Sequence, residues 1–223
     1  AHPWRAFAKQ TSRRSCVVEG NVSNQLAPPL VVRNMSPRAP TITPVEASAN
    51  RFGGLDIAIA NVSAIAIGQD EDCWRREFEV DMMGTVRLVD AAMPWLGASK
   101  SASIIAISSV SGREVDFAAG PYGTFKAALV HYMQGLAFQL GSKGIRANTV
   151  SPGNTYFPGG VWHQIEQGNP KLYAEALALN PSGRMGTPQE VANAVAFLAS
   201  PAASRVSGTN LVVDGALTRG VQL

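Results

Sequence analysis

From residue 51 to the end of the chain, short apolar runs alternate with amphipathic helical patterns, and this alternation restricts the fold more than any other feature. Strands that are separated by helices pair in parallel, and the helices then cover both faces of the sheet. The sequence therefore predicts a single α/β domain with a doubly wound, Rossmann-like parallel sheet. The strands are expected at 55–61, 101–109, 145–153 and 208–216, and the helices at 71–96, 121–144 and 187–200.

Two of these helices carry clear end signals. Pro121 opens the central helix, and Gly141 and Gly144 lie where it should end. The helix before the last strand begins with a capping-box pattern that joins Thr187 to Glu190. These signals fix the ends of the two helices more closely than apolar periodicity alone.

The first fifty residues lack this regularity. They hold six of the fourteen prolines but only one of the 21 glycines, Gly20. The runs 16–18 and 30–32 could form short strands, although their periodicity is poor. We expect residues 1–50 to be a degenerate part of the single domain and residues 51–223 to be its regular part.

The composition favours a compact protein in a reducing compartment. The 223 residues are 46% hydrophobic and 16% charged. Cys16 and Cys73 show no CxxC spacing, so neither a disulfide framework nor a metal site is expected, and the cytoplasm is the predicted location. The longest apolar run, 55–68, is too short to cross a bilayer, and the chain opens without a secretory-signal pattern, so no membrane partner is expected.

Positive charge is concentrated at the start of the chain. Residues 1–50 contain six basic and two acidic residues, a net charge of +4, whereas the rest contains 13 basic and 14 acidic residues. A basic end suits a nucleic-acid partner, but no recognition motif or interleaved aromatic residues accompany it. Nucleic-acid binding is therefore the weakest function considered, and no such partner is expected.

Polar side chains that can carry chemistry meet at one edge of the predicted sheet. Tyr122 and Lys126 lie four residues apart, hence on one helix face, where an ammonium favours the phenolate form of a phenol. Ser109 and Asn61 each end a strand, and ligands bind at the carboxyl ends of the strands in such a sheet. Two interpretations are open at this point: an exposed helix pair, or a general acid/base at a cleft.

The residues at this edge resemble the short-chain dehydrogenase/reductase family, whose signature is a serine thirteen positions before Tyr-x-x-x-Lys. In "ISSVSG" and "PYGTFK", Ser109 precedes Tyr122 by thirteen positions, and Lys126 completes the motif. The resemblance covers about residues 51–223. Further segments that resemble the family in order and spacing are "RFGGLDIAIAN", "FEVDMMG", "GIRANTVSPG" and "GTNLVVDGA".

The resemblance implies hydride transfer between NAD or NADP and an alcohol or carbonyl substrate. It implies that Tyr122 is the general acid/base, that Lys126 supplies a positive charge and holds the nicotinamide ribose, and that Ser109 orients the substrate oxygen. It implies no metal. The cofactor-binding residues that it implies are Asn61, Tyr122, Lys126, Pro152, Gly153, Thr155 and, at the adenine, Asn34.

One catalytic position departs from the family pattern. Asp81 stands where the family has an asparagine as its fourth catalytic residue. An ionised carboxylate only accepts hydrogen bonds, and its negative charge partly opposes Lys126. Asp81 is therefore retained as a weakened catalytic candidate.

The N-terminal region departs further. The glycine-rich loop that holds the pyrophosphate is not found, and residues 4–10 resemble the helix that follows this loop, so the first strand and the loop look missing or degenerate. Glu19 then falls near the end of the second strand and mildly favours NAD, whereas Arg13 and Arg14 argue for NADP. Three explanations stay open: residues absent from this chain, a remodelled stretch, or a natural loss of dinucleotide binding. The alternative function is accordingly an impaired family member that acts as a binding or oligomer partner.

The resemblance also indicates a substrate lid and a homo-oligomer. Residues 154–186 stand where the family's lid lies, and about half of its apolar side chains are expected to be structural. The apolar faces of helices 71–96 and 121–144 resemble the family's dimer interface, so a homodimer or homotetramer is expected. Members similar to this chain include 3-oxoacyl-carrier-protein reductases, and an aromatic, alicyclic or acyl substrate is indicated. The expected pocket roof is Tyr156, Phe157, Val161, Trp162 and Ile165.

Overall fold

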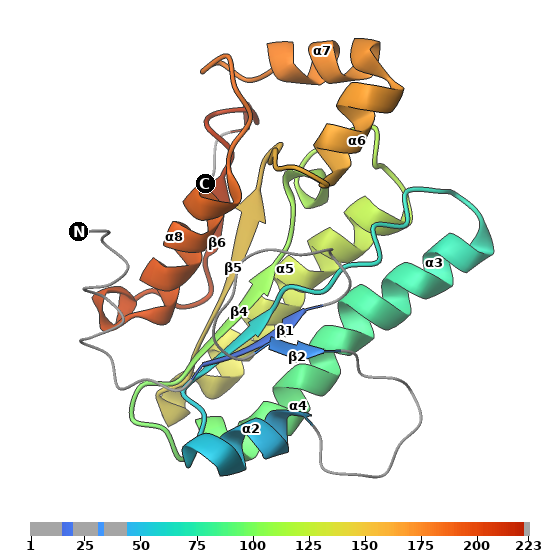
Figure 1. Cartoon of the computed structure of the whole chain (residues 1–223). Helices are drawn as coiled ribbons and strands as arrows, with labels where there is room; N and C mark the ends of the chain where they lie inside the picture. Colours follow the sequence, from blue (N-terminus) through green and yellow to red (C-terminus); the bar gives the residue numbers. More distant parts are fainter. Residues whose placement is uncertain (1–14, 20–30, 34–43, 221–223) are drawn as a thin grey trace.

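Six strands form one sheet in the computed structural model, and every neighbouring pair of strands is parallel (Figure 1). The structure describes residues 15–19, 31–33 and 44–220, with side chains from residue 44 onward. The strand order is β2-β1-β3-β4-β5-β6, so the chain reverses its direction of travel across the sheet between β1 and β3. The predicted doubly wound parallel sheet is thereby confirmed. The strands are β1 (Ser15–Glu19), β2 (Val31–Arg33), β3 (Ile57–Ala60), β4 (Ser103–Ile107), β5 (Arg146–Pro152) and β6 (Asn210–Val213).

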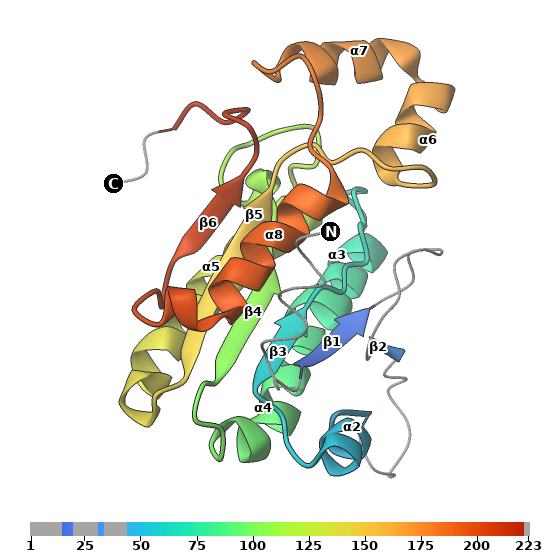
Figure 2. The same cartoon turned by 60° about the vertical axis from the view of Figure 1, so that its left-hand side comes forward.

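Helices cover both faces of this sheet (Figure 2). On one face, α4 and α5 bury Leu88 and Met133 in a cluster with Ile104 of β4. On the other face, α8 buries Leu198 against Ile105. The α-helices are α2 (Pro44–Phe52), α3 (Glu71–Glu77), α4 (Gly84–Leu96), α5 (Pro121–Leu140), α6 (Val161–Gly168), α7 (Pro170–Ala178) and α8 (Pro188–Ala199). Shorter helical turns are η1 (Phe78–Met83), η2 (Val110–Gly112), η3 (Gly141–Lys143) and η4 (Pro201–Ala203).

The N-terminal strands lie where the weak pattern placed them. The run 16–18 falls within β1, the run 30–32 overlaps β2 at residues 31–32, and Glu19 is the last residue of β1. In the described part of the chain, β1 pairs directly with β3 and no strand lies between them. The predicted adenine contact, Asn34, and the segment 4–10 lie outside the described residues.

The predicted helix 71–96 is continuous, but its middle is not an α-helix. Residues Phe78–Met83 form a π-helical segment between α3 and α4. Segments of this kind are rare and occur frequently at functional sites. Glu77 and Asp81, at the start and middle of this segment, are both fully buried although they are acidic.

The start of α5 requires a glycine. Gly120, which precedes the helix, has a φ of +123°, a conformation that side-chain-bearing residues rarely adopt. Pro121 then occupies the first helical turn, where its missing N–H costs no hydrogen bond. As a result Tyr122 lies in the first turn of α5, at the carboxyl ends of β4 and β5, and Lys126, one turn later, reaches the Ile107 carbonyl of β4.

The end of the domain also follows the sequence. Thr187 Oγ1 accepts a hydrogen bond from Glu190 N at 3.3 Å, and the Glu190 carboxylate accepts one from Thr187 N at 2.8 Å, so the predicted capping box is present.

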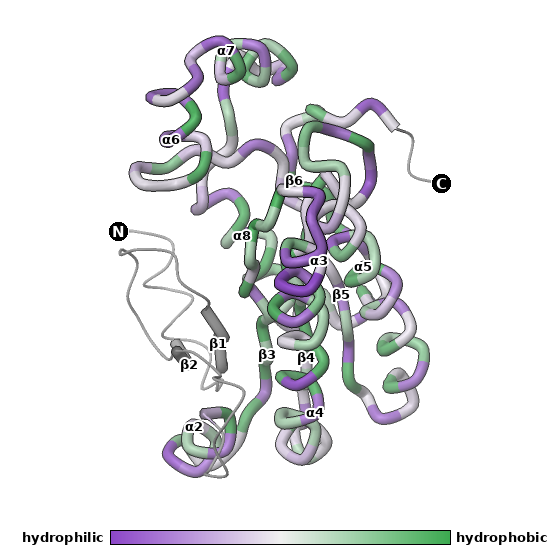
Figure 3. The backbone as a smooth tube through the Cα atoms, turned by 90° about the vertical axis from the view of Figure 1, so that its right-hand side faces the viewer, coloured by the Kyte–Doolittle hydropathy of each residue, from purple (hydrophilic) through white to green (hydrophobic). Residues whose placement is uncertain are grey.

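Hydrophobic colour runs along β3 and β4 in the centre of the sheet (Figure 3). Over the residues that the structure describes, no helix has the length and apolar character needed to cross a bilayer.

Candidate active site

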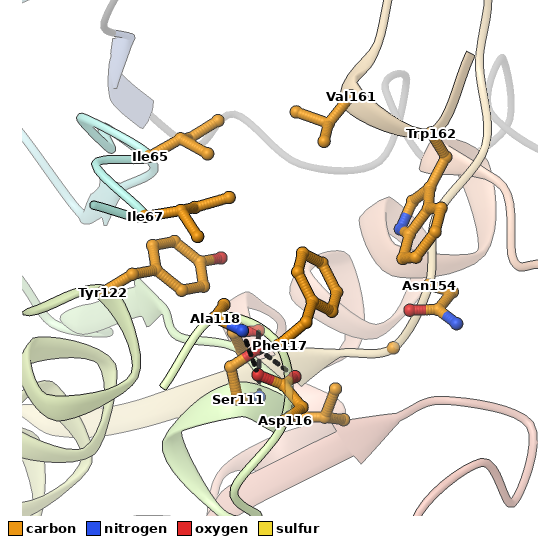
Figure 4. Close-up of a pocket in the computed structure, with 13 residues that line it drawn as sticks. Ile65, Ile67, Ser111, Asp116, Phe117, Ala118, Tyr122, Asn154, Val161 and Trp162 are labelled. Carbon is orange, nitrogen blue, oxygen red and sulfur yellow. Dashed lines mark hydrogen bonds between the residues drawn. The ribbon is translucent and has the colours of Figure 1, made fainter. Parts of the chain in front are cut away.

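A pocket of about 120 Å³ opens at the carboxyl ends of β4 and β5, beside the start of α5 (Figure 4). Its polar wall contains Ser109, Ser111 and Asp116, which follow β4, together with Tyr122 and Asn154. In Figure 4 the Tyr122 hydroxyl points into this space. The sequence predicts a cleft where three strand ends and one helix start converge, and the segments that follow β3, β4 and β5 line this pocket together with Tyr122 from the start of α5.

Apolar side chains line the rest of the pocket. Ile65 and Ile67 come from the loop after β3, and Val161 and Trp162 come from the start of α6. Phe117 completes the wall and packs edge-to-face on Trp162 with ring centroids 5.7 Å apart. The pocket thus offers a bound molecule both hydrogen-bonding groups and hydrocarbon surface.

Lys126 lies behind Tyr122 and is almost completely buried, with a side chain that is 3% exposed. Its ammonium forms an ion pair with Asp81 at 2.8 Å and donates to the Ile107 carbonyl at 3.2 Å. It also lies 5.5 Å from the centre of the Tyr122 ring. Burial by itself lowers the pKa of Lys126, but the neighbouring Tyr122 and Asp81 outweigh burial and raise it. The ammonium therefore keeps its charge beside the phenol.

The two serines at the end of β4 have different partners. Ser108 donates to the main-chain carbonyl of Lys126 at 2.7 Å and so ties α5 to the strand. Ser109 lines the pocket, and its hydroxyl contacts Ser111 Oγ at 3.3 Å, which in turn donates to Asp116 at 2.6 Å. The serine at the family spacing is thus the one that faces the pocket.

Asp81 is closer to the catalytic groups than its weakened status suggested, because it contacts Lys126 directly. Its second oxygen accepts a hydrogen bond from Ala64 N at 2.8 Å. Glu77, four residues earlier, accepts one from Ala66 N. The two carboxyl groups therefore hold both sides of Ile65, which has a φ of +49°, a strained conformation for a β-branched residue.

Glu77 was not among the residues predicted from the sequence. Two carboxylates four positions apart share one face of a helix, and this spacing was the available signal. Ser111 and Asp116 were also missed, because Ser111 has no assigned role within "ISSVSG", Asp116 belongs to no motif, and both enter the pocket through the turn after β4. The place of Ser111 and Asp116 in the pocket follows from the folded structure and from no pattern in the sequence.

The other residues predicted to bind cofactor lie along the same edge of the sheet. Gly153 lines the pocket directly after Pro152, the last residue of β5. Thr155 donates to the Gly153 carbonyl at 3.1 Å, and Asn61 is exposed directly after β3. These residues thus follow the ends of β3 and β5 at the same edge of the sheet, and their binding of a cofactor stays a prediction.

The segment 154–186 divides its apolar residues between the pocket and its own interior. Val161 and Trp162 line the pocket, whereas Tyr156 and Ile165 pack in a small cluster inside the segment. Tyr156 donates a hydrogen bond to Glu166, which raises the pKa of Tyr156 to about 12. Tyr156 is therefore held in its protonated form and does not compete with Tyr122 as an acid/base candidate.

A parallel doubly wound sheet with serine, tyrosine and lysine at its carboxyl edge defines a dinucleotide-dependent oxidoreductase. Residues 21–218 match the model of a protein family described as "Enoyl-(Acyl carrier protein) reductase". The chain belongs to the short-chain dehydrogenase/reductase family, whose members use NAD or NADP.

Relatives of known name are similar over most of the chain. Isoepoxydon dehydrogenase patN of Penicillium expansum is 46% identical over 181 residues, which are 80% of this chain and 69% of that protein. Cis-4-hydroxycyclohexanecarboxylate dehydrogenase of Sinomonas cyclohexanicum is 34% identical over 78% of this chain and 70% of that protein. The relatives named here are dehydrogenases, so they give no support to the alternative of an impaired binding partner.

Solved structures agree with this assignment. A short-chain dehydrogenase/reductase from Burkholderia xenovorans has a TM-score of 0.73 and 30% identity, over 78% of this chain and 68% of that chain. A 7α-hydroxysteroid dehydrogenase complexed with NADH and 7-oxo glycochenodeoxycholic acid has a TM-score of 0.66 and 29% identity, over 78% and 68% of the two chains.

The buried ion pair gives a prediction that does not depend on activity. Lys126→Met keeps the apolar stem but leaves the Asp81 carboxylate without its cation. We expect the free energy of unfolding in urea to fall by roughly 3–5 kcal/mol, the usual cost of breaking a buried pair. The double variant Asp81→Asn/Lys126→Met should lose at least about 1 kcal/mol less than the sum of the two single variants. Additive losses would show that the two groups are not coupled.

Proposed function

We propose that this protein transfers a hydride between NAD(P)(H) and a secondary alcohol or ketone on a small ring, with Tyr122 as the general acid/base. The observation that carries the proposal is the position of Tyr122. Its hydroxyl points into the pocket (Figure 4), which Ser109 also lines, and the buried ammonium of Lys126 lies 5.5 Å from the centre of its ring. A positioned proton-transfer group of this kind accelerates a reaction by typically 10²–10⁴-fold.

Each side chain has a defined task in this proposal. In the oxidation direction, Tyr122 accepts the proton of the substrate hydroxyl, and in the reduction direction it returns a proton to the carbonyl oxygen. Ser109 hydrogen-bonds the same oxygen and holds it in place. The Lys126 charge stabilises the phenolate form that appears in each cycle.

The residues present also suit one half of the cofactor. NAD(P) supplies or accepts the hydride when it is bound. Among the described residues, the Lys126 ammonium hydrogen-bonds only Asp81 and Ile107, so one of its three N–H groups is free to bind a ribose hydroxyl. Asn61 and Gly153 stand at the same edge of the sheet, next to this donor.

Other residues remain proposed cofactor contacts on the strength of the family resemblance. Pro152 and Thr155 flank Gly153, the glycine of the turn after β5, and Asn34 would meet the adenine. The weakened catalytic candidate Asp81 acts through the charge of Lys126, with which it forms an ion pair.

The pocket walls support a compact cyclic substrate that has more than one polar group. Ile65, Phe117 and Trp162 offer a hydrocarbon surface for a ring, and they exclude water from the reacting carbon. Asp116 and Asn154 offer hydrogen bonds at a distance from Tyr122 on the polar wall. The name of one relative contains a hydroxyl on a cyclohexane ring, and the proposal extends this substrate class to the present chain.

The acid/base role predicts a specific loss. Tyr122→Phe removes the proton-transfer group and leaves the ring in place. We expect turnover to fall roughly 10²–10⁴-fold, measured as the absorbance change of NADH or NADPH. Tyr132→Phe, a half-buried tyrosine on the same helix, is the matched control and should keep turnover near the wild-type value. Unchanged turnover in Tyr122→Phe would remove this tyrosine from the mechanism.

The polar wall predicts a preference among ring alcohols. Asp116→Asn loses a charged acceptor, a change that is worth about tenfold or more in binding a second hydroxyl. We expect kcat/KM for 1,2-cyclohexanediol to fall about tenfold, whereas the value for cyclohexanol falls less than about threefold. Asp90→Asn, on the exposed side of α4, is the control for a general charge effect. Equal losses for both alcohols would contradict a role for Asp116 in selecting the substrate.

We further propose that the chain forms a homodimer or homotetramer through the helices that the sequence singled out. Trp74 and Phe78 are 36% and 44% exposed, and both rings pack on Phe125 of α5 to form one aromatic patch. Family members often form oligomers, and a patch of this kind is typical of an interface.

The oligomer is tested by sedimentation velocity. Phe78→Glu places a charge in the aromatic patch and should reduce the sedimenting mass to that of one chain. Val115→Glu, at a side chain that is 93% exposed outside these helices, is the control and should leave the mass unchanged. A wild-type protein that sediments as a single chain at micromolar concentration would overturn the proposal.

A further inference from the structure

Two carboxyl groups and one ammonium are buried together beneath the pocket. The side chains of Glu77, Asp81 and Lys126 are at most 3% exposed. Asp81 forms the ion pair with Lys126, and Glu77 and Asp81 lie within hydrogen-bonding reach of each other. If both carboxyl groups were ionised, the cluster would carry one negative charge with no cation to balance it.

The hydrogen bonds of the Glu77 and Asp81 carboxyl groups indicate where a proton lies. Among the described residues, two buried side-chain oxygens receive no hydrogen bond, namely Glu77 Oε2 and Asp81 Oδ1. Asp81 Oδ1 has its ion pair with Lys126, whereas Glu77 Oε2 has no such partner. The other oxygen of each group accepts from the backbone, from Ala66 N and Ala64 N respectively. A proton on Glu77 that is donated to the Asp81 carboxylate satisfies both groups and balances the charge.

The surroundings favour this protonation state. Burial, followed by the hydrogen bond and the negative charge of Asp81, raises the pKa of Glu77 to about 8, although the Ala66 N–H and the Lys126 charge act in the opposite direction. The charged groups that face Glu77 are Asp81 from η1 and Lys126 from α5. The pocket loop, residues 62–67, carries no ionisable side chain and contributes only backbone N–H groups.

We propose that Glu77 and Asp81 hold one proton between them and that Glu77 is a positioning residue, which sets the charge beside Lys126 and fixes the pocket loop. The neutral asparagine of the family is replaced here by a carboxylate, and Glu77 supplies the proton that limits the added charge. Loss of this proton adds a negative charge near Lys126 and weakens the support that Lys126 gives to the Tyr122 phenolate.

The shared proton is tested first by infrared spectroscopy, without any turnover. Protein labelled with ¹³C-glutamate should show the carbonyl stretch of a protonated glutamic acid at pH 7, and this band should disappear with a midpoint near pH 8. The band should be absent from Glu77→Gln and present in Glu79→Gln, whose side chain is 45% exposed and paired with Arg87. Asp81→Asn removes the like charge, so the midpoint should move to lower pH. A wild-type protein without the band at pH 7 overturns the proposal.

Unfolding gives a second measurement that is independent of activity. The ordinary pKa of glutamate is 4.5, so between pH 4.5 and about 8 the folded protein keeps a proton that the unfolded chain loses. The stabilisation from this group is complete below pH 4.5 and is lost as the pH rises to 8. In this window the unfolding constant rises by up to tenfold per pH unit. Glutamine cannot ionise, so the ratio of the wild-type unfolding constant to that of Glu77→Gln should rise through this window. A ratio that does not change with pH contradicts a proton held by Glu77.

The positioning role rests on the proposed function and is measured by kinetics. The ratio of kcat/KM for alcohol oxidation, Glu77→Gln over wild type, should be constant below pH 7 and rise several-fold around pH 8, because only the wild type gains a negative charge there. The same ratio for Glu79→Gln should stay flat. A flat ratio for Glu77→Gln overturns the positioning role. Absence of turnover in the wild type overturns the proposed function instead, and the infrared and unfolding measurements still decide the shared proton.

Discussion

The Lys126–Asp81 ion pair is the constraint on which the rest of the site depends. It joins α5 to the π-helical segment η1 across the end of the sheet, in a place where neither charge reaches water. A lone charge at this depth is costly, so each partner holds the other in place. Tyr122, one turn before Lys126, and the pocket loop, bound by Asp81, are positioned by the same contact. Sheet, helix and pocket loop are therefore linked through these two side chains, by the contacts of Lys126 with Ile107 and of Asp81 with Ala64.

The strain in the pocket loop follows from this arrangement. Ile65 keeps a positive φ because the N–H groups of Ala64 and Ala66, on either side of it, are both bound to buried carboxyl groups. Without these two acceptors, no hydrogen bond would offset the cost of this conformation, which is of order 1–3 kcal/mol. The apolar wall of the pocket is thus held by acidic residues that a substrate never touches.

Much of the fold could be predicted because it rests on local rules. Apolar runs gave the strands, Pro121 and the Thr187–Glu190 pair marked helix starts, and the spacing of Ser109, Tyr122 and Lys126 located the catalytic edge. These features depend on neighbours in the sequence or on a motif with fixed spacing.

The rest depended on contacts between distant segments. Glu77 looks like one more acidic residue on a charged helix, and its burial becomes visible only when the loop after β3 packs on it. Asp116 enters the pocket through a turn whose path no periodicity specifies. Asp81 was predicted to be a weakened catalytic residue because of its negative charge. Its buried ion pair with Lys126 could not be predicted, because the two residues are 45 positions apart in the sequence.

The hydrogen bond from Ser108 to the main-chain carbonyl of Lys126 bears on how this scaffold can diversify. It fastens the reacting helix to β4 at the level of the proton-transfer group, so the helix cannot slide along its axis to suit a larger or smaller molecule. Adaptation to new substrates is left to the side chains of the loop 62–67, the turn after β4 and the start of α6, which line the pocket. Glu77 and Asp81 hold the loop by its backbone, so its side chains can change while the proton-transfer group keeps its place.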